Sequence, residues 1–157
     1  MSVRVVEPWI EGPLKRFVDD ARVTIALLLL PSGQVLAEHG FARSLDVAAA
    51  CALAAAIHAS GGELGRMLDG RPFSGLHHAG RDRQIFLGEA RTPRGTYIFL
   101  TVFDQESSLG LVRLYFDEFV ANLSAAAPEG RAGSDVVLGE NFERDLNRNL
   151  AALFGRA

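Results

Sequence analysis

The chain has 157 residues, of which 48% are hydrophobic and 22% are charged, and its formal net charge is -3. This size and composition predict one compact domain with a sizeable apolar core. The slightly acidic balance argues against a nucleic-acid partner, because nucleic-acid binders carry a basic patch or stripe.

The single cysteine, Cys51, cannot form an internal disulfide, which favours a reducing compartment. The N-terminal sequence MSVRVVEPWIEGPLKR has no long apolar segment or small-residue cleavage site, so we expect no signal peptide. The longest apolar runs, around residues 25–31 and 47–57, are shorter than the about 20 residues that span a bilayer. We therefore expect a cytoplasmic protein without membrane insertion.

The N-terminal third predicts a helix followed by a hairpin. A helical face over residues 11–21 carries Leu14, Phe17, Val18 and Ala21. Two apolar runs follow, 23–30 and 34–40, and a Pro-Ser-Gly turn joins them. The first run is apolar on both faces, which is typical of a central strand with helices on both sides of the sheet. The second run alternates with polar residues, and we expect it to be partly exposed.

A long helix is predicted over residues 45–68, with Ser44 as its N-cap and Asp46 in its first turn. One stripe of this helix is the expected core face: Val47, Cys51, Ala54, Ile57, Gly61, Leu64 and Leu68. A second stripe has only small residues: Ala48, Ala52, Ala55, Ala59 and Gly62. Two apolar faces need two partners, so we expect the small-residue face to approach a second helix closely, most simply that of a symmetry mate. The alternative is that alanine only promotes helix formation.

The remaining elements complete an α+β layered domain. Runs 73–79 and 84–90 read as a second hairpin, and 96–103 as a buried strand, giving a five-stranded antiparallel sheet. A helix then begins after Ser107 or Ser108 and places its apolar residues on one face: Leu109, Val112, Phe116, Val120 and Leu123.

The domain is expected to end at residue 123. Pro128, Gly130 and Gly133 break every period, so residues 124–135 are interpreted as a flexible linker. Residues 136–157 predict an amphipathic helix whose apolar face includes Phe142, Leu146, Leu150 and Phe154. This helix either folds back on its own domain or docks in a groove of a partner.

No pattern of catalytic, cofactor-binding or metal-binding residues emerges. His77 and His78 are adjacent on a predicted strand and point to opposite faces, so both cannot readily hold one ion. Neither a GxxxxGK[ST] phosphate loop nor a GxGxxG turn is present, and no GxSxG elbow accompanies the serines. Four arginines could supply an arginine finger to a partner, and the sequence does not choose among Arg66, Arg71, Arg81 and Arg83. The expectation is therefore no catalytic residues, no cofactor and no metal.

The chain resembles the Roadblock dynein-light-chain superfamily and, within it, the bacterial MglB-type regulators of a Ras-like small GTPase. The resemblance covers about residues 11–123. It lies in ALLLLPSGQVLAEHGF, AAACALAAAIHAS, HHAGRDRQIFLGEA and, most specifically, FLTVFDQESSLGLVRLYF.

This resemblance implies a homodimer whose paired long helices and sheets form a platform for a small GTPase. Such proteins activate the GTPase by repositioning its own catalytic groups and donate no arginine finger. The resemblance makes one flank of the long helix a candidate dimer or GTPase interface: Ala52, Ala55, Ala59, Gly62 and Arg66. Similar proteins carry a C-terminal extension that touches the GTPase, which favours docking of the predicted tail helix. Recruitment to a cell pole through the partner is a further expectation.

Two other functions remain open. A non-enzymatic scaffold of the same superfamily would assemble larger complexes without changing GTP turnover. A small-molecule sensor would use the sheet as a pocket wall, and a copurifying ligand would favour it.

Overall fold

The computed structural model describes residues 4–5 and 7–128, and its compact unit ends at Ala127. One antiparallel sheet runs through this unit in the order β1-β3-β2-β6-β5-β4. The predicted five-stranded sheet is confirmed, and a two-residue strand, β1, extends it at one edge. The strands are β1 (Arg4–Val5), β2 (Ile25–Leu29), β3 (Val35–Gly40), β4 (Gly75–Ala79), β5 (Gln84–Thr92) and β6 (Gly95–Phe103).

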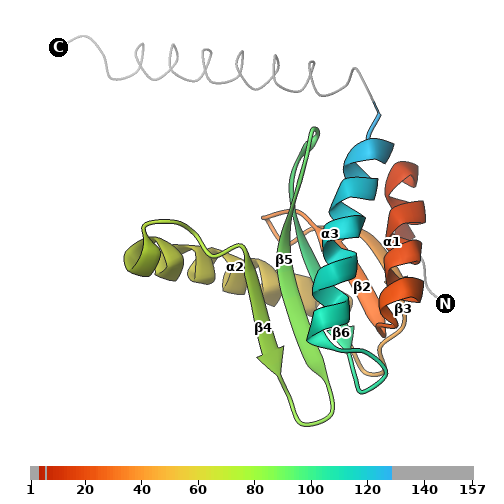
Figure 1. The fold of residues 1–157 in the computed structure, drawn as a ribbon, viewed down its shortest axis with the longest axis horizontal. Coiled ribbons are helices and arrows are strands. Elements are labelled where there is room, and N and C mark those ends of the chain that lie inside the picture. The colour runs from red at the N-terminus through yellow and green to blue at the C-terminus, as the bar shows by residue number, and fades with distance from the viewer. Residues whose placement is uncertain (1–3, 6, 129–157) are drawn as a thin grey trace. The chain divides into compact units, whose positions relative to one another are not determined.

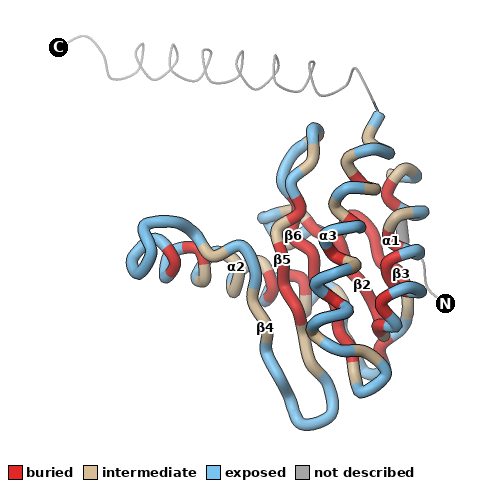
Figure 2. Tube along the Cα trace, in the orientation of Figure 1, coloured by how far each residue is buried: buried red, intermediate tan, exposed pale blue. Residues whose placement is uncertain are grey.

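Helices cover both faces of the sheet (Figure 1). The helices α1 (Pro8–Ala21) and α3 (Leu109–Ala126) pack side by side on one face, and α2 (Val47–Asp69) lies on the other. β2 lies between β3 and β6, and all five of its residues are buried (Figure 2). Its alternate side chains enter the two cores, with Ala26 and Leu28 facing α1 and α3. The predicted α+β layered architecture is therefore confirmed.

Aromatic rings fill the core beneath α1 and α3. The Phe99 ring lies 4.8 Å from that of Phe17 and 5.1 Å from those of Phe116 and Phe119, between ring centroids. Gly88 makes this packing possible, because a Cβ at that position would lie 2.7 Å from the Phe116 ring. The aromatic cluster therefore fixes α3 over β5 and β6.

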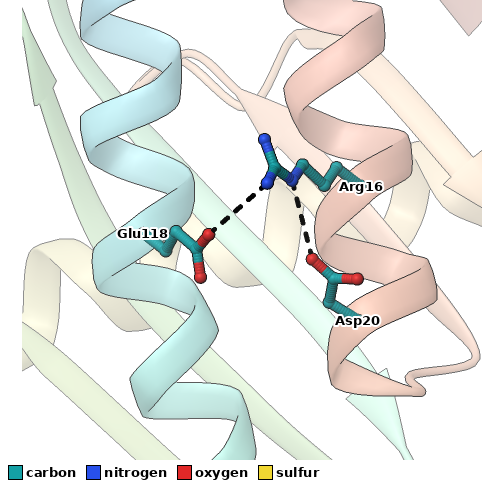
Figure 3. A network of polar contacts seen from close by, with 3 residues as sticks. All are labelled: Arg16, Asp20 and Glu118. Carbon is teal, nitrogen blue, oxygen red and sulfur yellow. Dashed lines mark ion pairs between the residues drawn. The ribbon is translucent and has the colours of Figure 1, made fainter.

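An ion-pair network joins α1 and α3 at the surface (Figure 3). Arg16 Nε lies 3.7 Å from Asp20 Oδ2, and Arg16 Nη2 lies 3.9 Å from Glu118 Oε1. All three side chains are largely exposed, so each pair contributes at most about 1 kcal/mol. The buried rings, not these charges, hold the two helices together.

Helix boundaries differ from the predicted ones for local reasons. α1 begins at Pro8, three residues before the predicted start, because proline suits the first helical position. α3 begins after Ser108, whose Oγ accepts a hydrogen bond from Leu111 N at 3.2 Å, as predicted. It continues to Ala126, so residues 124–126 are helix and not linker. The predicted linker beyond residue 128 and the predicted tail helix, with Phe142, Leu146, Leu150 and Phe154, lie outside the described residues.

The N-cap of α2 is Asp46 and not Ser44, so that prediction is wrong. Asp46 Oδ1 accepts a hydrogen bond from Ala49 N at 3.1 Å. Ser44 lies two residues earlier with φ +62°, in the left-handed region, where the chain turns out of the preceding loop. α2 therefore starts later than predicted.

The partial exposure predicted for β3 is also wrong. Leu36, Ala37, Glu38 and His39 are all buried. α1 packs on one face of β3, and β1 pairs along its outer edge. Covering elements from elsewhere in the chain therefore override the polar alternation of the local sequence.

The predicted core face of α2 is only half right. Cys51 and Ala54 are buried against the sheet, but Leu64 and Leu68 are exposed. The expectation that no segment is long and apolar enough to cross a membrane is also corrected. By length and composition alone α2 reaches that size, and only 22% of its most apolar stretch is buried inside the protein. α2 is thus an apolar helix with one covered face and one uncovered face.

Candidate functional site

One face of α2 carries large apolar side chains in contact with solvent. Its members are Leu53, Leu64, Met67 and Leu68, which are 64%, 53%, 80% and 72% exposed. Single exposed apolar residues are ordinary on protein surfaces, but four on one helix are typical of an interaction surface. We call this set the outer face of α2.

The sheet edge beside this helix is also uncovered among the described residues. β4 is the last strand of the sheet and is mostly exposed. Figure 1 shows the C-terminal half of α2 projecting past β4, beyond the edge of the sheet. An open edge presents unpaired N–H and C=O groups that can pair with another chain. The free edge and the apolar overhang therefore lie together.

The residues predicted as an interface lie along one flank of α2. Ala52 and Ala59 are exposed, Ala55 is half-buried against the core beneath the helix, and Arg66 is exposed and ion-paired with Glu63. Gly62 is buried. The structure thus places these five residues on one flank of the helix, and their role in an interface stays a prediction.

Gly62 on this flank and the nearby Gly65 face the connection that follows α2. A Cβ at Gly65 would lie 2.4 Å from Phe73 N and 2.6 Å from Arg71 O, and one at Gly62 would lie 3.7 Å from Pro72 Cβ. The connection between α2 and β4 therefore folds back onto the C-terminal half of α2. Close approach by this connection explains Gly65 without a second helix, whereas a Cβ at Gly62 would make only an ordinary van der Waals contact.

The outer face of α2 was not selected from the sequence, although a signal for it existed. Leu53 and Met67 belonged to neither predicted stripe. A helix that is apolar on all sides must be covered on all sides, and that signal indicates a third apolar face. A polar hollow between α2 and β5, which includes His58, Glu89 and Arg91, carried no sequence signal because its walls come from distant segments.

The serines and histidines that were considered as catalytic or metal-binding residues make contacts that stabilise the fold. Ser108 caps α3, and Ser107 Oγ donates a hydrogen bond to Ala21 O. His77 stacks beside Phe103 and lies 2.7 Å from Gln84 Oε1 through Nε2. His78 follows it on β4, so the two rings point to opposite faces as predicted. Among residues 4–5 and 7–128, no group of three or more His, Cys, Asp or Glu side chains could hold a metal ion.

The candidate arginines lie at the surface on different elements. Arg71 lies in the connection after α2, and Arg81 and Arg83 lie in the turn between β4 and β5. Arg83 Nη1 donates a hydrogen bond to Arg43 O at 3.1 Å, which joins this turn to the loop before α2. The four arginines are therefore not assembled around one point.

Cys51 belongs to the sheet-facing side of α2 and is completely buried. Burial, together with the nearby Glu38 carboxylate, raises the pKa of the Cys51 thiol to about 11. A thiol that stays protonated is a poor nucleophile. Cys51 therefore belongs to the core and not to a reactive site.

The architecture described above defines a class of protein. An antiparallel sheet with one long helix on one face and two helices on the other is the fold of Roadblock-type domains. The sequence matches no protein-family model and no curated protein.

Solved structures with this fold include MglB proteins. MglB of Myxococcus xanthus shares 22% identity with this chain at a TM-score of 0.69, over 76% of this chain and 95% of that one. The gliding protein MglB of Thermus thermophilus shares 22% identity at a TM-score of 0.70, over 80% and 96%. A Roadblock/LC7 domain from Streptomyces avermitilis shares 21% identity at a TM-score of 0.59, over 74% and 93%. The chain therefore has the Roadblock fold in its MglB-like form.

Proposed function

We propose that this protein is a homodimeric regulator of a Ras-like small GTPase, of the GTPase-activating type. It performs no bond-breaking chemistry and repositions the catalytic groups of the GTPase itself. The observation that carries the proposal is the outer face of α2 beside a free sheet edge, within a fold shared with MglB proteins. The activating role and the GTPase partner are carried over from the family resemblance and are for experiment to test. We place the complex in the cytoplasm, with recruitment to a cell pole through its partner.

A second copy of this chain suits the uncovered surface. If two β4 strands pair edge to edge about a two-fold axis, the sheet of one protomer continues into that of its partner. The overhanging half of α2 then lies over the partner's sheet, and its apolar residues are covered. One structure of MglB has a tetrameric arrangement, which supports self-association here.

The test measures GTP hydrolysis by a Ras-like GTPase of the same organism, with and without a saturating amount of this protein. We expect faster turnover. We also expect it to survive Arg66→Ala, Arg71→Ala, Arg81→Ala and Arg83→Ala, because an arginine finger contributes orders of magnitude in rate and its loss would be evident. Loss of activation in one of these variants would show that this arginine is donated to the GTPase as an arginine finger, and would contradict activation by repositioning.

The second candidate function is a scaffold of the same superfamily. The outer face of α2 favours it equally, because that surface explains assembly without any effect on catalysis. GTP-dependent binding without faster turnover would establish this function. Absence of GTPase binding in any nucleotide state would remove the activating role and leave the function open.

The tail belongs to the same experiment. We propose that Phe142, Leu146, Leu150 and Phe154 dock on the GTPase. A chain truncated after Ala127 retains every described helix and strand. It should remain folded and bind the GTPase more weakly than the full chain. Equal affinity would remove the tail from the interface.

A further inference from the structure

A polar hollow of about 400 Å³ lies between the C-terminal half of α2 and strand β5. Its walls include His58, Gly62 and Arg66 from α2, Phe73 from the following connection, and Glu89 and Arg91 from β5. This volume is in the range of sites that bind small groups. The fold places the hollow on the predicted interface flank of α2, next to Ala59.

Two ion pairs flank the hollow, and they differ in exposure. Glu63 and Arg66 form one pair at the rim, with side chains 70% and 56% exposed. Glu89 Oε2 lies 3.2 Å from Arg91 Nη2; the Arg91 side chain is 73% exposed, whereas that of Glu89 is only 17% exposed. Glu89 is therefore the least hydrated charge of the four, and its attraction for a cation is the least screened by water.

His58 provides an unused hydrogen-bonding atom at the same place. Its Nε2 is buried and has no hydrogen-bond partner among the described residues. An imidazole nitrogen that carries no proton accepts a hydrogen bond. Because this nitrogen is shielded from solvent, the acceptor that the wall between α2 and β5 offers to a ligand is the Glu89 carboxylate.

The geometry points to a binding site for a guanidinium group, presented by an arginine side chain of a protein that docks on this flank of α2. Glu89 is the anchor, because a carboxylate accepts the paired N–H donors of a guanidinium in a planar, two-bond arrangement. The incoming guanidinium takes the place of the Arg91 guanidinium at Glu89, and Arg91, whose side chain is 73% exposed, then extends into solvent. An anionic ligand is disfavoured, because both arginines are already paired and Glu89 would repel it.

This inference goes beyond the proposed function and does not depend on a GTPase. It assigns a chemistry to one point of the surface, whichever protein docks there. Failure of GTPase activation would leave the site intact, and absence of the site would leave activation open.

The test is a titration of the isotopically labelled full-length protein, followed by backbone amide NMR. The probes are N-acetylarginine methylamide, its neutral citrulline analogue and the anionic N-acetylaspartate methylamide. We expect shifts centred on Gly62 and Glu89 with the arginine probe only. Glu89→Gln should weaken binding at least about 10-fold, as expected for loss of a charged hydrogen-bond acceptor. Glu63→Gln, the matched change at the exposed rim, should weaken it less than about 2-fold.

Several results would overturn the inference. Equal shifts with the citrulline probe, preference for the anionic probe, or unchanged affinity in Glu89→Gln would each remove the guanidinium site. Free arginine serves as a further probe because it carries its own charged amino and carboxyl groups. Binding of free arginine about 10-fold or more tighter than the capped probe would assign the site to a small molecule and not to a protein partner.

Discussion

A single carboxylate sets the start of α2. Asp46 accepts a hydrogen bond from Ala49 N, one of the free N–H groups of the first helical turn. We expect Asp46→Ala to lower the free energy of unfolding by about 1 kcal/mol. Ser44→Ala is the matched control, because Ser44 lies outside the helix, and it should change stability by only a few tenths. Urea denaturation of the two variants checks this, and a larger effect of Ser44→Ala would restore it as the cap.

The buried thiol of Cys51 makes the free energy of unfolding depend on pH. Its pKa is about 11 in the folded protein against an ordinary value of 9.0. Between these values the unfolded chain loses a proton that the folded chain keeps, so stability falls as pH rises from about 9 to 11. Native Cys51 should also react with iodoacetamide at least about 100-fold more slowly near pH 8 than the urea-unfolded chain.

The variant Cys51→Ala is the control for this pH dependence. Its free energy of unfolding should fall less than that of the wild type between about pH 9 and 11, because the thiol is absent. An identical loss in Cys51→Ala would assign the effect to other groups. Rapid alkylation of the native protein would show that the α2 layer opens readily.

At the scale of elements, prediction from the sequence succeeded where the apolar pattern of the element itself indicates which of its residues are buried. The strand at 96–103 and the helix α3 were predicted correctly, because the apolar residues of each element are themselves the residues that pack in the core. β3 was mispredicted because the burial of Glu38 and His39 depends on α1 and β1. The hollow beside Glu89 was beyond prediction, since it exists only where the connection after α2 folds back beside β5.

The small residues of α2 illustrate the same limit. Gly61 and Gly65 look alike in the sequence, yet a Cβ at Gly61 meets nothing within 4 Å whereas one at Gly65 meets backbone at 2.4 Å. We expect Gly61→Ala to stabilise the protein by up to about 1 kcal/mol through helix propensity. Gly65→Ala should destabilise it by about 1–3 kcal/mol through forced displacement of the connection.

Thermal unfolding of the two alanine variants distinguishes propensity from packing. Opposite shifts of the melting temperature are expected. A rise in both would mean that the connection at residues 71–73 moves away freely and that close approach is not the reason for Gly65.

At the scale of the whole molecule, both the outer face of α2 and the β4 edge are uncovered among the described residues. The fold buries a complete core on both sides of the sheet and still leaves Leu53, Leu64, Met67 and Leu68 exposed. Core packing therefore does not require these residues to be apolar. A binding surface does require apolar residues. In a two-fold symmetric dimer each contact that such a residue makes occurs twice.

Leu64→Arg tests this surface without touching the core, because the Leu64 side chain is 53% exposed. An unpaired charge in an apolar contact is costly, so self-association should weaken at least about 30-fold while the far-ultraviolet circular dichroism stays unchanged. Asp117→Arg on α3, exposed on the opposite face of the sheet, is the matched control and should leave the mass in solution unaltered.

Analytical ultracentrifugation of the variants, with vesicle flotation for a monomer, distinguishes three outcomes. A dimer that Leu64→Arg dissociates places a second copy over the outer face of α2. An unaffected dimer, with Ala59→Arg dissociating it instead, moves the contact to the small-residue flank predicted from the sequence. A wild-type monomer that floats with phosphatidylglycerol vesicles, and loses this binding in Leu64→Arg, would assign the outer face to a lipid surface and overturn the dimer.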